Sequence, residues 1–127
     1  MNVAAHGIDL VECARIASLV DRHGNRFCDR ILTDRERTYI DTHKLPIPHI
    51  AGRFAAKEAI LKVLGTGWRG KIAWRDIEIL NDPAGRPDVT LRGECAAIAE
   101  RLGMTRVLIS ITHTDTYASA SAIGLSD

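Results

Sequence analysis

The 127 residues are enough for one hydrophobic core but too few for two independent ones, so we expect a single domain over residues 1–127. A formal net charge of +1 excludes a general nucleic-acid binder, whose basic excess is usually plain. No apolar run approaches the ~18 residues of a membrane span, and three cysteines without metal-ligand spacing favour reduced thiols in a cytoplasmic protein.

The first expected elements are a strand and a helix. A short apolar beginning predicts a strand whose end carries Asp9, and residues 14–23 predict a helix stopped by Gly24. Four arginines would line one side of this region if helicity persisted past Gly24: Arg15, Arg22, Arg26 and Arg30. The alternative is a solvated face offset by Asp21 and Asp29.

A capping-box pattern marks the next helix. Thr33 would be its N-cap with Glu36 three residues later, and the helix should run to about residue 43. Two prolines, Pro46 and Pro48, are too close together for a helix interior, so the following helix is expected to begin soon after Pro48.

That following helix combines an apolar stripe with charged residues. Gly65 stands where a left-handed C-cap is expected, and apolar residues recur at helical spacing: Ile50, Phe54, Leu61 and Leu64. Glu58 lies four residues from both Phe54 and Lys62, so its carboxylate borders the apolar face. One explanation is a surface ion pair worth roughly 0.3 to 0.5 kcal/mol; the other is a functional site.

The last third of the chain predicts a hairpin, a helix and a second hairpin. Alternating or β-branched runs separated by turn residues give strands, and Gly103 ends the helix. In chain order the expected elements are residues 77–79, 89–91, 94–102, 107–114 and 117–123. Together with the earlier helices they predict one α+β domain built on an antiparallel sheet packed with helices.

Three segments carry recognisable motifs. They are a Gly-x-Asp with a following Arg-Ile, a Phe-x-x-Lys-Glu-Ala-x-x-Lys helix and a Ser-Ile-Thr-His-Thr strand end, present here as Gly7, Asp9, Arg15 and Ile16, as residues 54–62 and as residues 110–114. In this order, over about residues 7–122, they resemble the holo-[acyl-carrier-protein] synthases, which are small bacterial 4'-phosphopantetheinyl transferases. The resemblance implies the 4'-phosphopantetheinyl transferase fold and a role in fatty acid biosynthesis.

The activity implied is transfer of 4'-phosphopantetheine from coenzyme A to a serine of apo acyl carrier protein, releasing adenosine 3',5'-bisphosphate. Charge builds on the pyrophosphate oxygens, and Mg²⁺ suits this chemistry because one or two carboxylates hold it together with water and phosphates. The resemblance gives the metal to Asp9 and Glu58; without it, Asp9 would be a turn or helix-capping carboxylate. It also makes Lys62 a catalytic contact to the coenzyme A phosphates.

Further coenzyme A contacts follow from the resemblance. Arg53 looks like a 3'-phosphate contact, with a solvated surface arginine as the alternative. His113 and Thr114 look like contacts at the nucleotide end, although a lone histidine in a turn is usually structural or solvated. The Gly65 backbone could approach the ligand, and capping alone would also explain it. Lys57 points about 100° away from Glu58 on an ideal helix, so a structural role is at least as probable for it as contact with the ligand.

The expected partners are the acyl carrier protein, coenzyme A and identical copies of the chain. Arg15, the one arginine that matches the family motif, is expected to dock the acidic carrier protein. The family forms homotrimers with active sites at subunit interfaces, so His113 and Arg53 would act on ligand held by a neighbouring copy. An exposed hairpin edge at residues 117–123, with alternating small residues, would suit such packing.

One loop departs from the family pattern. Several basic residues often precede the motif helix in the family, whereas this chain has only Lys44 before a Leu-Pro-Ile-Pro run.

The alternative function is a non-catalytic coenzyme A or nucleotide-binding module. Such a module would have no need of Asp9 together with Glu58.

Overall fold

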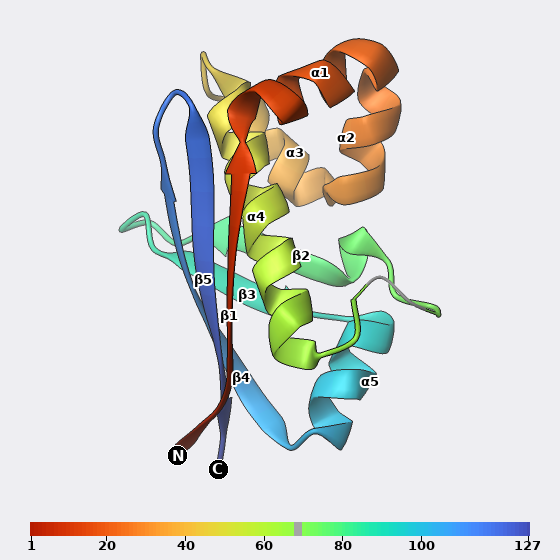
Figure 1. The fold of residues 1–127 in the computed structure, drawn as a ribbon, viewed down its shortest axis with the longest axis vertical. Coiled ribbons are helices and arrows are strands. Elements are labelled where there is room, and N and C mark those ends of the chain that lie inside the picture. Colours follow the sequence, from red (N-terminus) through yellow and green to blue (C-terminus); the bar gives the residue numbers. More distant parts are fainter. Residues whose placement is uncertain (68–69) are drawn as a thin grey trace.

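The fold consists of two antiparallel sheets and five α-helices in residues 1–67 and 70–127, the part of the chain that the computed structural model describes (Figure 1). It therefore confirms the expected α+β class. The elements in chain order are β1 (Asn2–Glu12), α1 (Cys13–His23), α2 (Asn25–Ile31), α3 (Asp34–Asp41), α4 (Pro46–Leu64), a 3-10 turn η1 (Trp74–Asp76), β2 (Ile77–Asn81), β3 (Pro87–Leu91), α5 (Gly93–Arg101), β4 (Met104–His113) and β5 (Tyr117–Ser126).

The last strand in sequence lies at the centre of the larger sheet. The strand order is β1-β5-β4, while β2 and β3 form a separate hairpin. Asn2 pairs with Ser126, which brings the two ends of the chain together (Figure 1). The expectation of an exposed hairpin edge at residues 117–123 is wrong, because β5 has a neighbouring strand on each side.

Helix α4 packs across one face of this sheet, against β1 and β5. The small residues of β5 face it and are buried: Ala118, Ala120 and Ala122. Gly7 in β1 also has a packing reason, since a Cβ there would overlap the backbone oxygen of Ala59 in α4. Small side chains thus bring the motif helix close to the sheet, and they do not form an outer surface.

The opposite face of the three-stranded sheet is uncovered, because the helices lie to one side of it (Figure 1). Ile8 and Leu10 of β1 are 58% and 64% exposed, and Leu108 of β4 is 39% exposed. His6 and Ser121 join across this face at 3.1 Å. The sheet therefore presents apolar side chains to the exterior of the isolated chain.

Two helix boundaries differ from the sequence prediction. Helix α4 begins at Pro46, because prolines in a first turn lose no intrahelical hydrogen bond. Gly24 ends α1 with φ of 56°, and a separate helix, α2, starts directly after it. The four arginines therefore do not line one continuous helix. The capping box of α3 is present as predicted: Thr33 Oγ1 accepts from the Glu36 N–H, and Glu36 accepts from the Thr33 N–H at 2.8 Å.

Candidate active site

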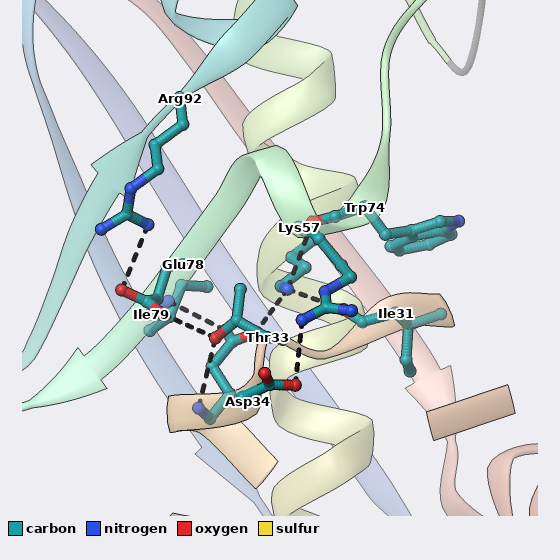
Figure 2. A network of polar contacts seen from close by, with 10 residues as sticks. Ile31, Thr33, Asp34, Lys57, Trp74, Glu78, Ile79 and Arg92 are labelled. Atoms are coloured by element: carbon teal, nitrogen blue, oxygen red, sulfur yellow. Dashed lines mark hydrogen bonds and ion pairs between the residues drawn. The ribbon is translucent and has the colours of Figure 1, made fainter. Parts of the chain in front are cut away.

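A buried polar network fixes the middle of α4 (Figure 2). Lys57 is fully buried, and its Nζ lies 2.7 Å from Glu36 Oε1 and donates to the Ile31 carbonyl at 2.7 Å. The other oxygen of Glu36 accepts from the Ile79 N–H at 2.8 Å. Burial lowers the pKa of Lys57, and the charge of Glu36 opposes that change. Lys57 thus has a structural role, which was one of its two alternatives.

Asp9 and Lys62 meet where β1 contacts α4. Lys62 Nζ donates to the Ile8 carbonyl at 2.7 Å and lies 3.4 Å from Asp9 Oδ1. Asp9 is inside β1, not at its end, and Glu12 is the N-cap of α1, so the helix-capping alternative for Asp9 is wrong. Glu58 is half-buried and stands one turn before Lys62 on α4. The Asp9–Lys62 contact therefore joins two of the three motifs.

The carboxylates of Asp9 and Glu58 fit a cation that takes only one or two ligands from the protein and the others from water and substrate. No group of three or more histidine, cysteine or acidic side chains able to hold a metal occurs among the described residues. Two carboxylates from α4 and β1 match the one or two that usually hold Mg²⁺ beside substrate phosphates. Asp9 and Glu58 would then be its protein ligands.

Arg53 lies in the interior. It is 4% exposed, so the solvated alternative is wrong. Its Cζ lies 4.7 Å from the centre of the Tyr39 ring, and its Nη2 donates to Asn81 Oδ1 at 2.7 Å. Its buried Nε has no hydrogen-bond partner among the described residues. Burial lowers the pKa of Arg53. The side chain is therefore held in one place with a donor group still unused.

His113 is the last residue of β4 and is exposed. Its ring lies 5.3 Å from that of His49 in α4. Thr114 begins the β4–β5 turn, where its Oγ1 accepts from the Thr116 and Tyr117 N–H groups. The turn thus fixes the position of the strand end that carries His113.

The remaining candidates lie at the two ends of the helical layer. Gly65 has φ of 75° and caps α4, as predicted, and it borders a cavity of about 320 Å³ with Lys71 of the following loop. Arg15 is exposed on α1, with its Cζ 5.5 Å from the centre of the Phe54 ring. A larger cavity of about 480 Å³, between β3, β4 and α5, contains none of the candidate residues.

The candidates form two groups within one chain. Asp9 belongs to one edge strand, with Lys62 beside it and Glu58 one helical turn from Lys62, whereas His113 belongs to the other edge strand, with the ring of His49 beside it. With β5 between them, the edge strands are roughly 10 Å apart. Three residues beside the second group were not predicted from the sequence, because no motif or spacing links them: Tyr39, His43 and His49.

Comparison with known proteins gives a consistent result. A family profile described as the 4'-phosphopantetheinyl transferase superfamily matches residues 5–120. The chain is 44% identical over 117 residues to the holo-[acyl-carrier-protein] synthase of Koribacter versatilis, covering 92% of this chain and 94% of that protein.

Solved structures are similar over almost the whole chain. The holo-[acyl-carrier-protein] synthase of Neisseria meningitidis has a TM-score of 0.90 at 32% identity, covering 98% of this chain and 100% of that chain. The Helicobacter pylori synthase, solved in complex with coenzyme A, has a TM-score of 0.83 at 32% identity, covering 94% and 99%. This similarity confirms the fold that the motifs implied.

Proposed function

Because the chain belongs to the 4'-phosphopantetheinyl transferase superfamily, we infer that it has holo-[acyl-carrier-protein] synthase activity. It transfers the 4'-phosphopantetheine group of coenzyme A to a serine of an apo acyl carrier protein. The observation that carries this conclusion is the 44% identity to a synthase over nearly the full length of both chains.

The reaction is a phosphoryl-type displacement. The serine oxygen attacks the β-phosphorus, the bond from that phosphorus to the bridging oxygen breaks, and the hydroxyl proton is lost. Adenosine 3',5'-bisphosphate leaves with the bridging oxygen. A protein accelerates such a step mainly by positioning the reactants and neutralising charge. Lys62 is suited to this, because its side chain is 55% exposed and is aimed by Ile8 and Asp9.

A divalent cation completes this half of the site in our proposal. Bound Mg²⁺ would neutralise charge on the pyrophosphate oxygens. Asp9 and Glu58 are its proposed protein ligands, on the chemistry of the donors and the packing of α4 on β1. Asp9 then has two partners of positive charge, the cation and Lys62, and it orients both.

Arg53, His113 and Thr114 are proposed to contact the nucleotide end of coenzyme A, with Gly65 near the ligand backbone. The separation of His113 and Thr114 from Asp9 across the sheet favours a site shared between copies of the chain. The uncovered outer sheet face, with Ile8 and Leu10, offers the apolar surface that a homotrimer needs. We therefore propose a homotrimer with interfacial active sites.

Carrier-protein docking is proposed at Arg15. Its guanidinium is exposed beside the motif helix, where it can attract an acidic partner.

Three cysteines are buried and unpaired, as expected, which fits a protein of the reducing cytoplasm. Within the described residues, no helix has the length and apolar character needed to cross a membrane.

One assay tests the function. The protein is incubated with coenzyme A, Mg²⁺ and an apo acyl carrier protein, and the carrier is weighed by mass spectrometry. We expect the phosphopantetheine adduct on its serine and no adduct when coenzyme A is omitted. Tight coenzyme A binding without any adduct, on a carrier that another synthase does modify, would identify a non-catalytic binding module instead.

A further inference from the structure

Three histidine rings lie in a row at the N-terminal part of α4, one pair tilted and the other edge-to-face. His43 follows α3 and its ring centre lies 3.9 Å from that of His49, which in turn lies 5.3 Å from that of His113. Tyr39 packs against the His43 ring at 4.7 Å. Residues 43–49 and the end of β4, which are far apart in the sequence, thus place three titratable rings together, and only His113 belongs to a family motif.

The groups that act electrostatically on His49 are two other histidines and an arginine. They are the neighbouring rings of His43 and His113 and the guanidinium of Arg53, and burial together with these groups lowers the pKa of His49. Lys44 follows His43 directly in the chain. Cations gathered without a counter-charge mark a place where an anion would be stabilised.

Glu36 does not serve as that counter-charge. Glu36 acts on Arg53, but its oxygens already accept from Lys57 and from the Thr33 and Ile79 N–H groups. Asp115, in the β4–β5 turn, lines a hollow with residues 45–48. The buried Nε of Arg53 still has no partner in the part of the chain that the structure describes.

The hydrogen bond made by His43 shows how the histidine row would gain positive charge. Its Nδ1 lies 3.0 Å from the Tyr39 carbonyl, which can only accept, so Nδ1 carries the hydrogen. In the neutral ring, Nε2 is then an acceptor and disfavours an anion. Protonation turns Nε2 into a donor and adds a positive charge.

We propose that His43 and His49 join His113 and Arg53 in binding the 3'-phosphate of coenzyme A, and that binding of this phosphate takes up protons on the histidine row. The proposal rests on the proposed function, which requires the pyrophosphate to lie at Asp9, Glu58 and Lys62. Only the ribose phosphate then remains for a second cationic site. His43 and His49 thereby do the work of the basic loop residues that this chain lacks.

Binding should therefore weaken as the histidines lose their protons. For each proton taken up with the ligand, the dissociation constant rises by up to about tenfold per pH unit. The phosphate has its second ionisation near pH 6, so the ligand charge is nearly constant only above about pH 7. Over that range, changes in the dissociation constant with pH arise from groups of the protein.

The experiment measures binding of adenosine 3',5'-bisphosphate to the full chain by calorimetry between about pH 7 and 8.5. Buffers of different ionisation enthalpy report the protons taken up. For the unmodified protein we expect weakening of about tenfold or more over this range, with net proton uptake. H49F keeps an aromatic ring but cannot titrate, and it should reduce the change to less than about threefold. H43F should reduce it in part.

Three controls make the outcome decisive. H23Q alters an exposed histidine at the end of α1 and should keep the full pH dependence. 3'-Dephospho-coenzyme A, which lacks the phosphate in question, should bind with little pH dependence. Circular dichroism identifies any variant that fails to fold, and H43F, at the more peripheral position, then carries the test.

An unchanged pH dependence in folded H49F and H43F, or the same dependence for 3'-dephospho-coenzyme A, would overturn the proposal. Because the readout is binding, it is independent of transfer. A protein that shows the expected proton uptake but never modifies a carrier would refute the proposed function and leave this site standing.

Discussion

Two lysines five residues apart on α4 have opposite surroundings. Lys57 is fully buried, with its ammonium between Glu36 and two carbonyl oxygens. The Lys62 side chain is 55% exposed and beside Asp9. The first is committed to the fold, whereas the second is available to a substrate.

Replacing each lysine by methionine should separate these roles. K57M leaves Glu36 buried without its cation, which costs about 3 to 5 kcal/mol of unfolding free energy. K62M should change stability by less than about 1 kcal/mol, as for an exposed ion pair, and lower kcat. Urea unfolding of both variants gives the comparison, and equal losses of stability would contradict it.

The two acids near Lys62 should matter for turnover and little for stability. D9N and E58Q keep the side-chain shape but remove the charge proposed to hold Mg²⁺. We expect kcat to fall by about a hundredfold or more, with unfolding curves close to normal. Turnover measured at limiting Mg²⁺ provides the check. Near-normal rates in both variants would show that these acids do not bind the cation.

At the scale of elements, the approach of α4 to the sheet depends on glycine. A Cβ at Gly7 would collide with the Ala59 backbone oxygen, which cannot move without the helix. At Gly52 the nearest atom is a methyl group of Ile111, which can shift. The two positions therefore make a matched pair for testing how closely β1 and α4 must pack.

We expect G7A to lose about 1 to 3 kcal/mol of stability, as for overpacking, and most of its activity, because Asp9 would move from Lys62. G52A should lose less of both. Thermal unfolding and transfer assays on the two proteins make the comparison. A G7A protein as active as G52A would show that this close contact does not position the site.

Glu78 in β2 accepts a hydrogen bond from Thr33 at the start of α3, and we expect this contact to weaken in acid. Burial raises its pKa, but hydrogen bonds from Thr33 and Arg92 and the charges of Arg92 and Arg35 outweigh burial and lower it overall. Its contribution to stability is therefore present above about pH 4.5 and lost as the pH falls below that value. E78Q should flatten this acid limb of a stability-against-pH curve, and an unchanged limb would contradict the assignment.

The sequence predicted elements better than their arrangement. Periodicity located most of the helices and strands, and the capping box and Gly65 gave two helix ends, because these signals are local. Strand order is not local, so β5 was placed at an edge when it is central. The alanines of β5 looked like an outer surface for the same reason. His43 and His49 carry no motif and became visible only through their packing.

At the scale of the whole molecule, the candidate site is divided between the two edges of one sheet. We propose that identical copies pack on the uncovered sheet face, and its apolar residues replace residues 117–123 as the basis for expecting a homotrimer. Sites shared at interfaces would bring Glu58 of one copy to His113 of the next.

Mixing two inactive chains tests this arrangement. H113A and E58A chains that exchange subunits in equal amounts should regain about a quarter of the wild-type activity, because each shared site needs one intact residue from each of two copies. Sedimentation establishes the oligomeric state and labelled chains establish exchange. Mixtures that stay inactive despite exchange, or an active monomer, would rule out shared sites.

The pairing of Asn2 with Ser126 also sets the order in which the molecule can be built during translation. β1 leaves the ribosome first but has no partner strand until β5, the last strand made, emerges after it. Helix α4 is likewise made before the alanine surface on which it packs. The nascent chain therefore exposes first an unpaired strand and then also its apolar helix until β5 has been made.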